Sequence, residues 1–60
     1  MSREELYAEV KFAAKVWKYY GRLAGLERKC GNHRAAEMCD MVAARWEERF
    51  DDLFEYWYEG

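Results

Sequence analysis

Positively charged side chains recur along one side of the first half of the sequence, and their spacing suits an extended anion. Five lysine or arginine residues lie three, four or seven positions apart, at Lys11, Lys15, Lys18, Arg22 and Lys29. Residues three or four apart share a face of an α-helix, and such a row of cations can follow the phosphates of nucleic acid. Tyr19 borders the row and offers a ring on which an unpaired base can stack. We call these five residues the basic row and treat it as a candidate nucleic-acid face.

Carboxylates and aromatic rings are interleaved near the end of the sequence, over residues 51–58. This pattern is typical of a protein-binding surface, in which aromatic side chains supply the binding and a charged rim surrounds them. The candidate partner face consists of Asp51, Phe54, Glu55 and Tyr58. Two other interpretations stay open: the rings close the end of a helical bundle, or the acidic surface imitates phosphates and blocks a nucleic-acid-binding protein.

The sequence contains no pattern typical of catalysis or metal binding. Its carboxylates fall on an open helix face, whereas a catalytic acid–base pair needs a pocket that gives the two groups different proton affinities. The spacing of Cys30, His33 and Cys39 matches no standard zinc site. We therefore expect no catalytic, cofactor or metal site, and we expect both cysteines to be buried as small hydrophobic residues. A disulfide across the turn is the alternative for the cysteines.

The elements that must position these surfaces are two long helices joined at Gly31. Ser2 and Glu5 form the pattern of a capping box, so a first helix is expected over residues 3–30. Gly31 is the residue type favoured just past a helix end, because that position needs a positive φ angle. The first helix should therefore end at this glycine.

A second helix is expected over residues 33–58, with Asn32 as its N-cap. The side-chain oxygen of an N-cap asparagine accepts a backbone amide that has no partner within the helix. The predicted fold is all-α, a single domain over residues 1–60 that forms an antiparallel two-helix hairpin. Lys11 and Lys15 should then approach acidic side chains of the second helix.

The first helix is apolar over roughly 200° of its circumference. One stripe at 3/4 spacing contains Leu6, Val10, Ala13, Trp17, Tyr20 and Ala24, and a second contains Phe12, Val16, Tyr19, Leu23, Leu26 and Cys30. The other helix has one main stripe, at Ala35, Cys39, Val42, Trp46, Phe50, Leu53 and Trp57. A helix with one partner needs an apolar face of only about 100°, so we expect the first helix to contact more than one helix.

Charge is distributed unevenly along the predicted hairpin. Residues 22–34, at the turn, carry net +3, whereas residues 1–9 and 47–60, at the open end, carry net −7. Two hairpins packed antiparallel would set each basic turn against an acidic open end. We therefore expect a homodimer that forms an antiparallel four-helix bundle. The residues expected to mediate self-association are Trp17, Tyr20, Gly21, Ala24, Trp46, Phe50 and Trp57.

Size and composition narrow the classes of function. A chain of 60 residues rarely gains more than about 3–5 kcal/mol from one core, and a second chain is a usual source of further support. The charged first residues and the lack of a run of roughly 20 apolar residues favour a cytoplasmic protein with no membrane partner. We expect a non-enzymatic regulator, adaptor or inhibitor that self-associates and binds another protein. The alternative is an RNA- or DNA-binding regulator that uses the basic row.

Overall fold

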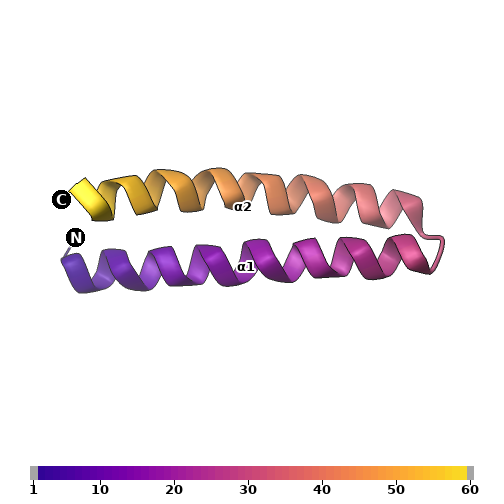
Figure 1. Ribbon diagram of the computed structural model, residues 1–60, viewed down its shortest axis with the longest axis horizontal. Helices are drawn as coiled ribbons and strands as arrows, with labels where there is room; N and C mark the ends of the chain where they lie inside the picture. The colour runs from indigo at the N-terminus through magenta and orange to yellow at the C-terminus, as the bar shows by residue number, and fades with distance from the viewer. Residues whose placement is uncertain (1, 60) are drawn as a thin grey trace.

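A computed structural model describes residues 2–59 as two antiparallel α-helices joined by a short turn (Figure 1). Helix α1 spans Arg3–Lys29 and helix α2 spans His33–Glu59. The two ends of the chain lie together at one end of the hairpin, and the turn lies at the other. The predicted all-α hairpin is confirmed, and its helix boundaries agree with the expected ones to within one residue.

The start of α1 is fixed by its first four residues. The Oγ atom of Ser2 accepts a hydrogen bond from the backbone N–H of Glu5 at 3.1 Å, and the Ser2 carbonyl accepts one from Leu6 N–H at 3.0 Å. Glu4 and Glu5 lie in the first turn, where negative charge stabilises the positive end of the helix dipole. The predicted N-cap at Ser2 is confirmed.

The turn is a Schellman motif centred on Gly31. This glycine has φ +86°, and its N–H donates to the Arg28 carbonyl at 3.2 Å while Asn32 N–H donates to the Glu27 carbonyl at 2.8 Å. These two bonds satisfy carbonyls that the end of α1 would otherwise leave without a partner. The glycine stop that the sequence predicted is confirmed.

Asn32 begins α2 through its backbone, because its carbonyl accepts the N–H of Ala36 at 2.9 Å. Its side chain, however, turns back toward α1, where Nδ2 donates to Glu27 Oε2 at 3.0 Å. Among the described residues this is the only side-chain hydrogen bond of Asn32. The predicted side-chain cap on α2 is therefore wrong, and the same amide instead ties the turn to α1.

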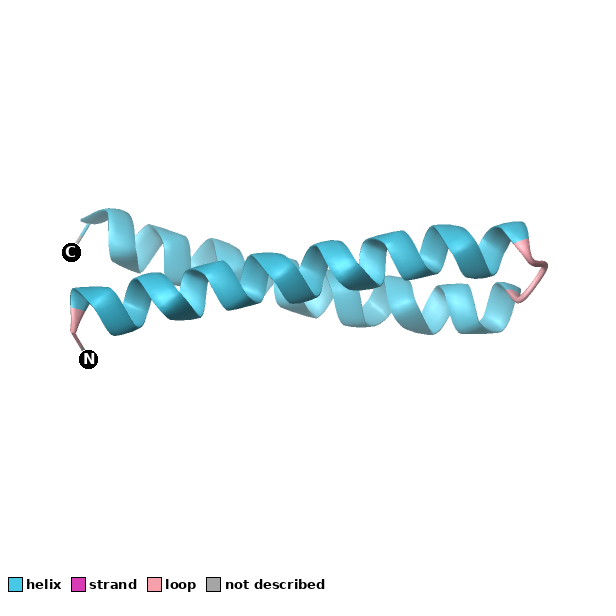
Figure 2. Cartoon of the chain, turned by 90° about the horizontal axis from the view of Figure 1, so that it is seen from below, coloured by secondary structure: helices cyan, strands magenta, loops and turns pink. Residues whose placement is uncertain are grey.

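Small side chains form the seam between the helices. Figure 2 shows α1 and α2 crossing at a shallow angle near the middle of their length. The buried hydrophobic residues are Val10, Ala13, Ala24, Ala36 and Ala43. Alanine lets two helix backbones approach closely but buries little apolar area. Within residues 2–59 no large side chain is fully buried, so the hairpin has a seam and no wider core.

The hairpin is elongated, with extents of 43 × 14 × 13 Å. The radius of gyration of its Cα atoms is 13.6 Å, whereas a compact domain of this length has a radius near 10 Å, by about 2.2·N^0.38. Because the rod is only two helices thick, every helix keeps a face that no other part of the described chain covers.

Candidate interaction surfaces

The basic row lies along a solvent-exposed side of α1. All five of its side chains are exposed. The Nζ atom of Lys11 sits over the Tyr7 ring, 5.5 Å from its centroid, a cation–π contact within its own helix. In the described part of the chain, the helices share one ion pair, which does not involve Lys11 or Lys15. The expected approach of these lysines to acids of α2 therefore forms no ion pair among the described residues.

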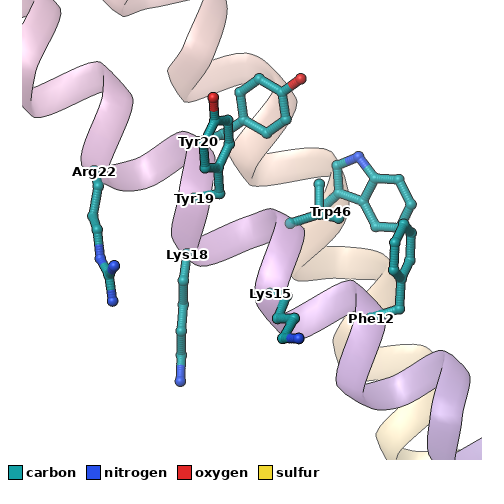
Figure 3. Close-up of a pocket in the computed structure, with 8 residues that line it drawn as sticks. Phe12, Lys15, Lys18, Tyr19, Tyr20, Arg22 and Trp46 are labelled. Carbon is teal, nitrogen blue, oxygen red and sulfur yellow. The ribbon is translucent and has the colours of Figure 1, made fainter.

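A shallow pocket of about 640 Å³ lies beside the basic row. We call it the Tyr19 pocket, and its lining consists of Phe12, Lys15, Val16, Lys18, Tyr19, Tyr20, Arg22 and Trp46. In Figure 3, Lys18 and Arg22 extend on one side of α1, and the rings of Tyr19 and Tyr20 stand on the other. Cations and aromatic rings of α1 thus line one pocket from different sides of that helix, and α2 contributes Trp46.

Phe12 and Trp46 form the wall of the Tyr19 pocket that joins the two helices. Their ring centroids are 5.6 Å apart and the rings are nearly perpendicular, at 77°, a favourable edge-to-face geometry. Sequence reasoning did not place Phe12 beside Trp46, because each residue sits in an apolar stripe of a different helix. Only the register and rotation of the two helices bring them together, and neither quantity is encoded in the spacing within one helix.

A second group of rings runs along the open end of the hairpin. We call it the aromatic cluster, and it consists of Tyr7, Trp17, Phe50, Phe54, Trp57 and Tyr58. Phe54 lies at its centre, with centroids 5.7 Å from Phe50, 5.8 Å from Trp57 and 6.2 Å from Tyr58. The Arg3 guanidinium lies 5.2 Å from the Trp57 ring centroid. These rings contact one another, yet most remain in part accessible to solvent.

The aromatic cluster and the Tyr19 pocket occupy opposite flanks of the seam. An α-helix turns about 100° per residue, so Tyr7 and Phe12 lie roughly 140° apart around α1. Tyr7 contacts Trp57, whereas Phe12 contacts Trp46. One flank can therefore be covered by another molecule while the other stays open.

The residues predicted for self-association fall in three environments. Trp17, Tyr20, Trp46, Phe50 and Trp57 are half-buried on the flanks of the seam. Gly21 is exposed, and a Cβ atom built on it would meet nothing within 4 Å. Ala24 is only 1% exposed and packs within the seam of its own hairpin.

The predicted partner face lies at the open end of α2. Asp51, Phe54, Glu55 and Tyr58 are all exposed, and Phe54 and Tyr58 belong to the aromatic cluster with Asp51 and Glu55 beside them. Tyr58 is 74% exposed, one of the largest values among the hydrophobic side chains. The structure thus places aromatic and acidic groups together at this end.

The two cysteines lie at the turn and in the first part of α2. Cys30 is exposed, Cys39 is half-buried and both thiols are free; the expectation that both are buried is wrong for Cys30, because that residue caps α1 at the edge of the turn. Within residues 2–59 no group of three His, Cys, Asp or Glu side chains is arranged to hold a metal ion.

Comparison of the chain with protein-family models, with curated proteins and with solved structures finds no match. In the part of the chain that the structure describes, neither helix combines the length and the apolar character needed to cross a bilayer.

Proposed function

We propose that the chain is a non-enzymatic helical protein that works by self-association and by contact with other proteins, as a regulator, adaptor or inhibitor in the cytoplasm. Its assembled form is an antiparallel four-helix bundle of two chains. The observation that carries the proposal is the amount of surface that one hairpin leaves open.

The accessible surface of the hairpin is 5002 Å². A compact protein of 7.3 kDa exposes about 4,200 Å². The excess, on the order of 800 Å², equals the area that one partner contributes to an interface of ordinary size. A second hairpin is therefore the partner whose size fits the uncovered surface.

The aromatic cluster supplies the apolar part of the proposed interface. Tyr7 is 47% exposed and Phe54 is 42% exposed, although both already contact other rings. Removing apolar surface from water contributes about 25 cal/mol per Å², and large aromatic side chains are the residues that most often dominate binding. Covering this flank adds buried apolar area to a hairpin whose own seam buries little.

Charge selects the antiparallel arrangement of the two hairpins. The turn end carries net +3 and the open end carries net −7. Asp51 and Glu55 border the aromatic cluster, so an antiparallel partner brings its basic turn, with Lys29 and Arg34, toward these acids. A parallel arrangement would instead place two acidic ends side by side, which costs energy through like-charge repulsion.

Self-association is tested by light scattering coupled to gel filtration, with micromolar protein. We expect a mass twice the 7.3 kDa of one chain. The variant Phe54→Glu should shift the mass toward one chain, because it places a charge in the aromatic cluster. Tyr56→Glu is the matched control, since Tyr56 is exposed on α2 but makes no ring contact among the described residues. Circular dichroism checks that both variants remain helical.

A charge exchange tests the orientation. One variant carries Asp51→Lys with Glu55→Lys, and the other carries Lys29→Glu with Arg34→Glu. Each variant alone should associate more weakly than the natural sequence, because the exchanged positions then face like charges across an antiparallel pair. An equimolar mixture restores opposite charges at those positions and should form a heterodimer. A wild-type protein that elutes as a single chain at micromolar concentration would refute the proposal. Self-association of the first variant as tight as that of the natural sequence would refute the antiparallel orientation.

A further inference from the structure

We propose that the Tyr19 pocket binds a short unpaired stretch of nucleic acid, with bases on its rings and phosphates on the basic row. The site is separate from the aromatic cluster to which we assign self-association. The pocket lies on the opposite flank of the seam, so a dimer formed through the aromatic cluster leaves the pocket open. Of the basic row, only Lys29 also takes part in the proposed dimer contact.

The rings of the pocket are available to a flat ligand. Phe12 is 55% exposed and Tyr19 is 60% exposed, values that leave much of each side chain in contact with solvent. Tyr20 packs against Tyr19 with centroids 5.2 Å apart and the rings nearly perpendicular, at 89°. Trp46 supports Phe12 from α2. Neighbours thus hold Phe12 and Tyr19 in place while much of each ring remains uncovered, which is what a base-stacking platform requires.

The charge of the pocket is positive throughout. Its ionisable lining consists of Lys15, Lys18 and Arg22, with no acidic side chain among the described residues that line it. Tyr19 lies within one helical turn of each of these cations, but Lys18 and Arg22 extend to the other side of α1 from its ring (Figure 3). A bound strand that stacks a base on Tyr19 must therefore cross α1 to place its phosphates on Lys18 and Arg22.

The basic row extends the site beyond the pocket. From Lys11 to Arg22 it runs for about 17 Å of helix at roughly 1.5 Å per residue, and Lys29 continues it toward the turn. The acidic residues of the open end lie in the other direction. A bound strand should therefore leave the pocket toward the turn end, where the net charge is positive.

Exposed rings favour a single strand over a duplex as the ligand. Double-stranded nucleic acid presents its phosphates to a basic row, but its bases are stacked within the helix and cannot lie on Tyr19. An acidic protein segment would also satisfy the cations. One such segment is the acidic, aromatic end of a second copy, residues 47–59. The experiment below separates the two occupants.

Binding is measured by fluorescence anisotropy with labelled twelve-residue oligothymidylate and oligouridylate, and with a duplex of equal length. We expect the single strands to bind and the affinity to fall as salt concentration rises. Tyr19→Leu should weaken binding by about ten-fold or more, because stacking on one base is lost, and Tyr19→Phe should retain it. Tyr56→Leu, which removes an exposed tyrosine of α2, is the matched control and should have no effect.

The phosphate contacts have their own readout. Lys15→Gln and Lys18→Gln should each reduce the slope of log affinity against log salt concentration by about 0.7, whereas Arg45→Gln on α2 should leave the slope unchanged. Circular dichroism excludes loss of helix as the cause.

Three results would overturn the proposal. The first is equal binding of duplex and single strand, and the second is an affinity that does not change in Tyr19→Leu; either would show attraction to any polyanion. The third is Tyr19-dependent binding of a peptide of residues 47–59 without binding of the oligonucleotides, which would assign the pocket to a second copy of the chain. None of these results depends on the mass measurements that test self-association.

Discussion

Arg28 Nη2 lies 2.6 Å from Asp40 Oδ2, and this ion pair joins the last turn of α1 to α2. About half of each side chain is exposed, 52% for Arg28 and 51% for Asp40. Exposed pairs gain little because water screens them, so the pair should contribute roughly 0.2–1 kcal/mol. The ion pair therefore links the two helices near the turn but contributes little to the free energy of unfolding.

A double-mutant cycle measures this contribution. Arg28→Gln, Asp40→Asn and the double variant are unfolded in urea at low salt, and the coupling free energy should fall within the range of an exposed pair, about 0.2–1 kcal/mol. Because salt screens charges at the surface, the coupling should shrink in 1 M sodium chloride. Glu37→Gln, which removes an exposed acid of α2 that has no ion-pair partner among the described residues, is the control. A coupling that grows with salt would contradict this account.

The close seam predicts a strong effect of a larger side chain at Ala13. Ala13 is 0% exposed, so Ala13→Leu must push the helices apart and should destabilise the hairpin by about 1–3 kcal/mol. Ala8→Leu makes the same change at an exposed position of α1 and should change the free energy of unfolding by less than about 0.5 kcal/mol. Equal effects of the two substitutions in urea unfolding would mean that the helices do not pack through Ala13.

Substitution by alanine should have opposite effects on stability at two of the glycines. A Cβ atom on Gly25 meets nothing within 4 Å, so Gly25→Ala should stabilise α1 by roughly 0.5–1 kcal/mol through helix propensity. Gly31 has φ +86°, and Gly31→Ala should cost about 1–2 kcal/mol because a side chain is strained there. Thermal unfolding followed by circular dichroism compares the two, and stabilisation by Gly31→Ala would show that the turn has a different backbone conformation.

Stability should depend on protein concentration if the proposed dimer forms. Association stabilises only the folded chain, so the unfolding midpoint must rise with concentration. We expect a higher urea midpoint at 100 μM than at 1 μM for the natural sequence. Phe54→Glu should show no such rise, and a midpoint independent of concentration in both proteins would show that the hairpin folds as a single chain.

Local chemistry made the helix ends predictable from the sequence. A cap involves residues within about four positions of one another, so it can be recognised in a short stretch of sequence. This holds for Ser2 with Glu5, and for Gly31 with the carbonyls of Glu27 and Arg28. The Asn32 prediction failed for a related reason. Its side chain had a competing acceptor in Glu27, which the turn brings close and which the sequence of α2 alone does not reveal.

The packing was less predictable than the helices. Periodicity correctly placed Val10, Ala13 and Ala24 on the seam. It also placed Trp17 and Tyr20 on the same stripe and so predicted equal burial for them. These rings are only half-buried, because helices that approach through alanine leave no space for an indole or a phenol between them. Helical spacing identifies a face, and the sizes of the side chains on both helices decide which part of that face closes.

The candidate surfaces also differ in how far the sequence predicts them. The exposure of the basic row followed from spacing within one helix. The Tyr19 pocket did not, because it needs Trp46 from α2 at the level of Phe12 in α1. Spacing also did not reveal the contact of Lys11, which lies over the Tyr7 ring of its own helix and forms no ion pair with α2 among the described residues.

Gly31 also decides whether the two helices stay separate. Each helix has 27 residues, and a helical conformation at the turn would merge them into one rod of about 85 Å. Such a rod could rebuild the alanine seam only by exchanging halves with a second rod, as in domain swapping. The left-handed backbone at one glycine therefore determines which polypeptide supplies each half of the seam.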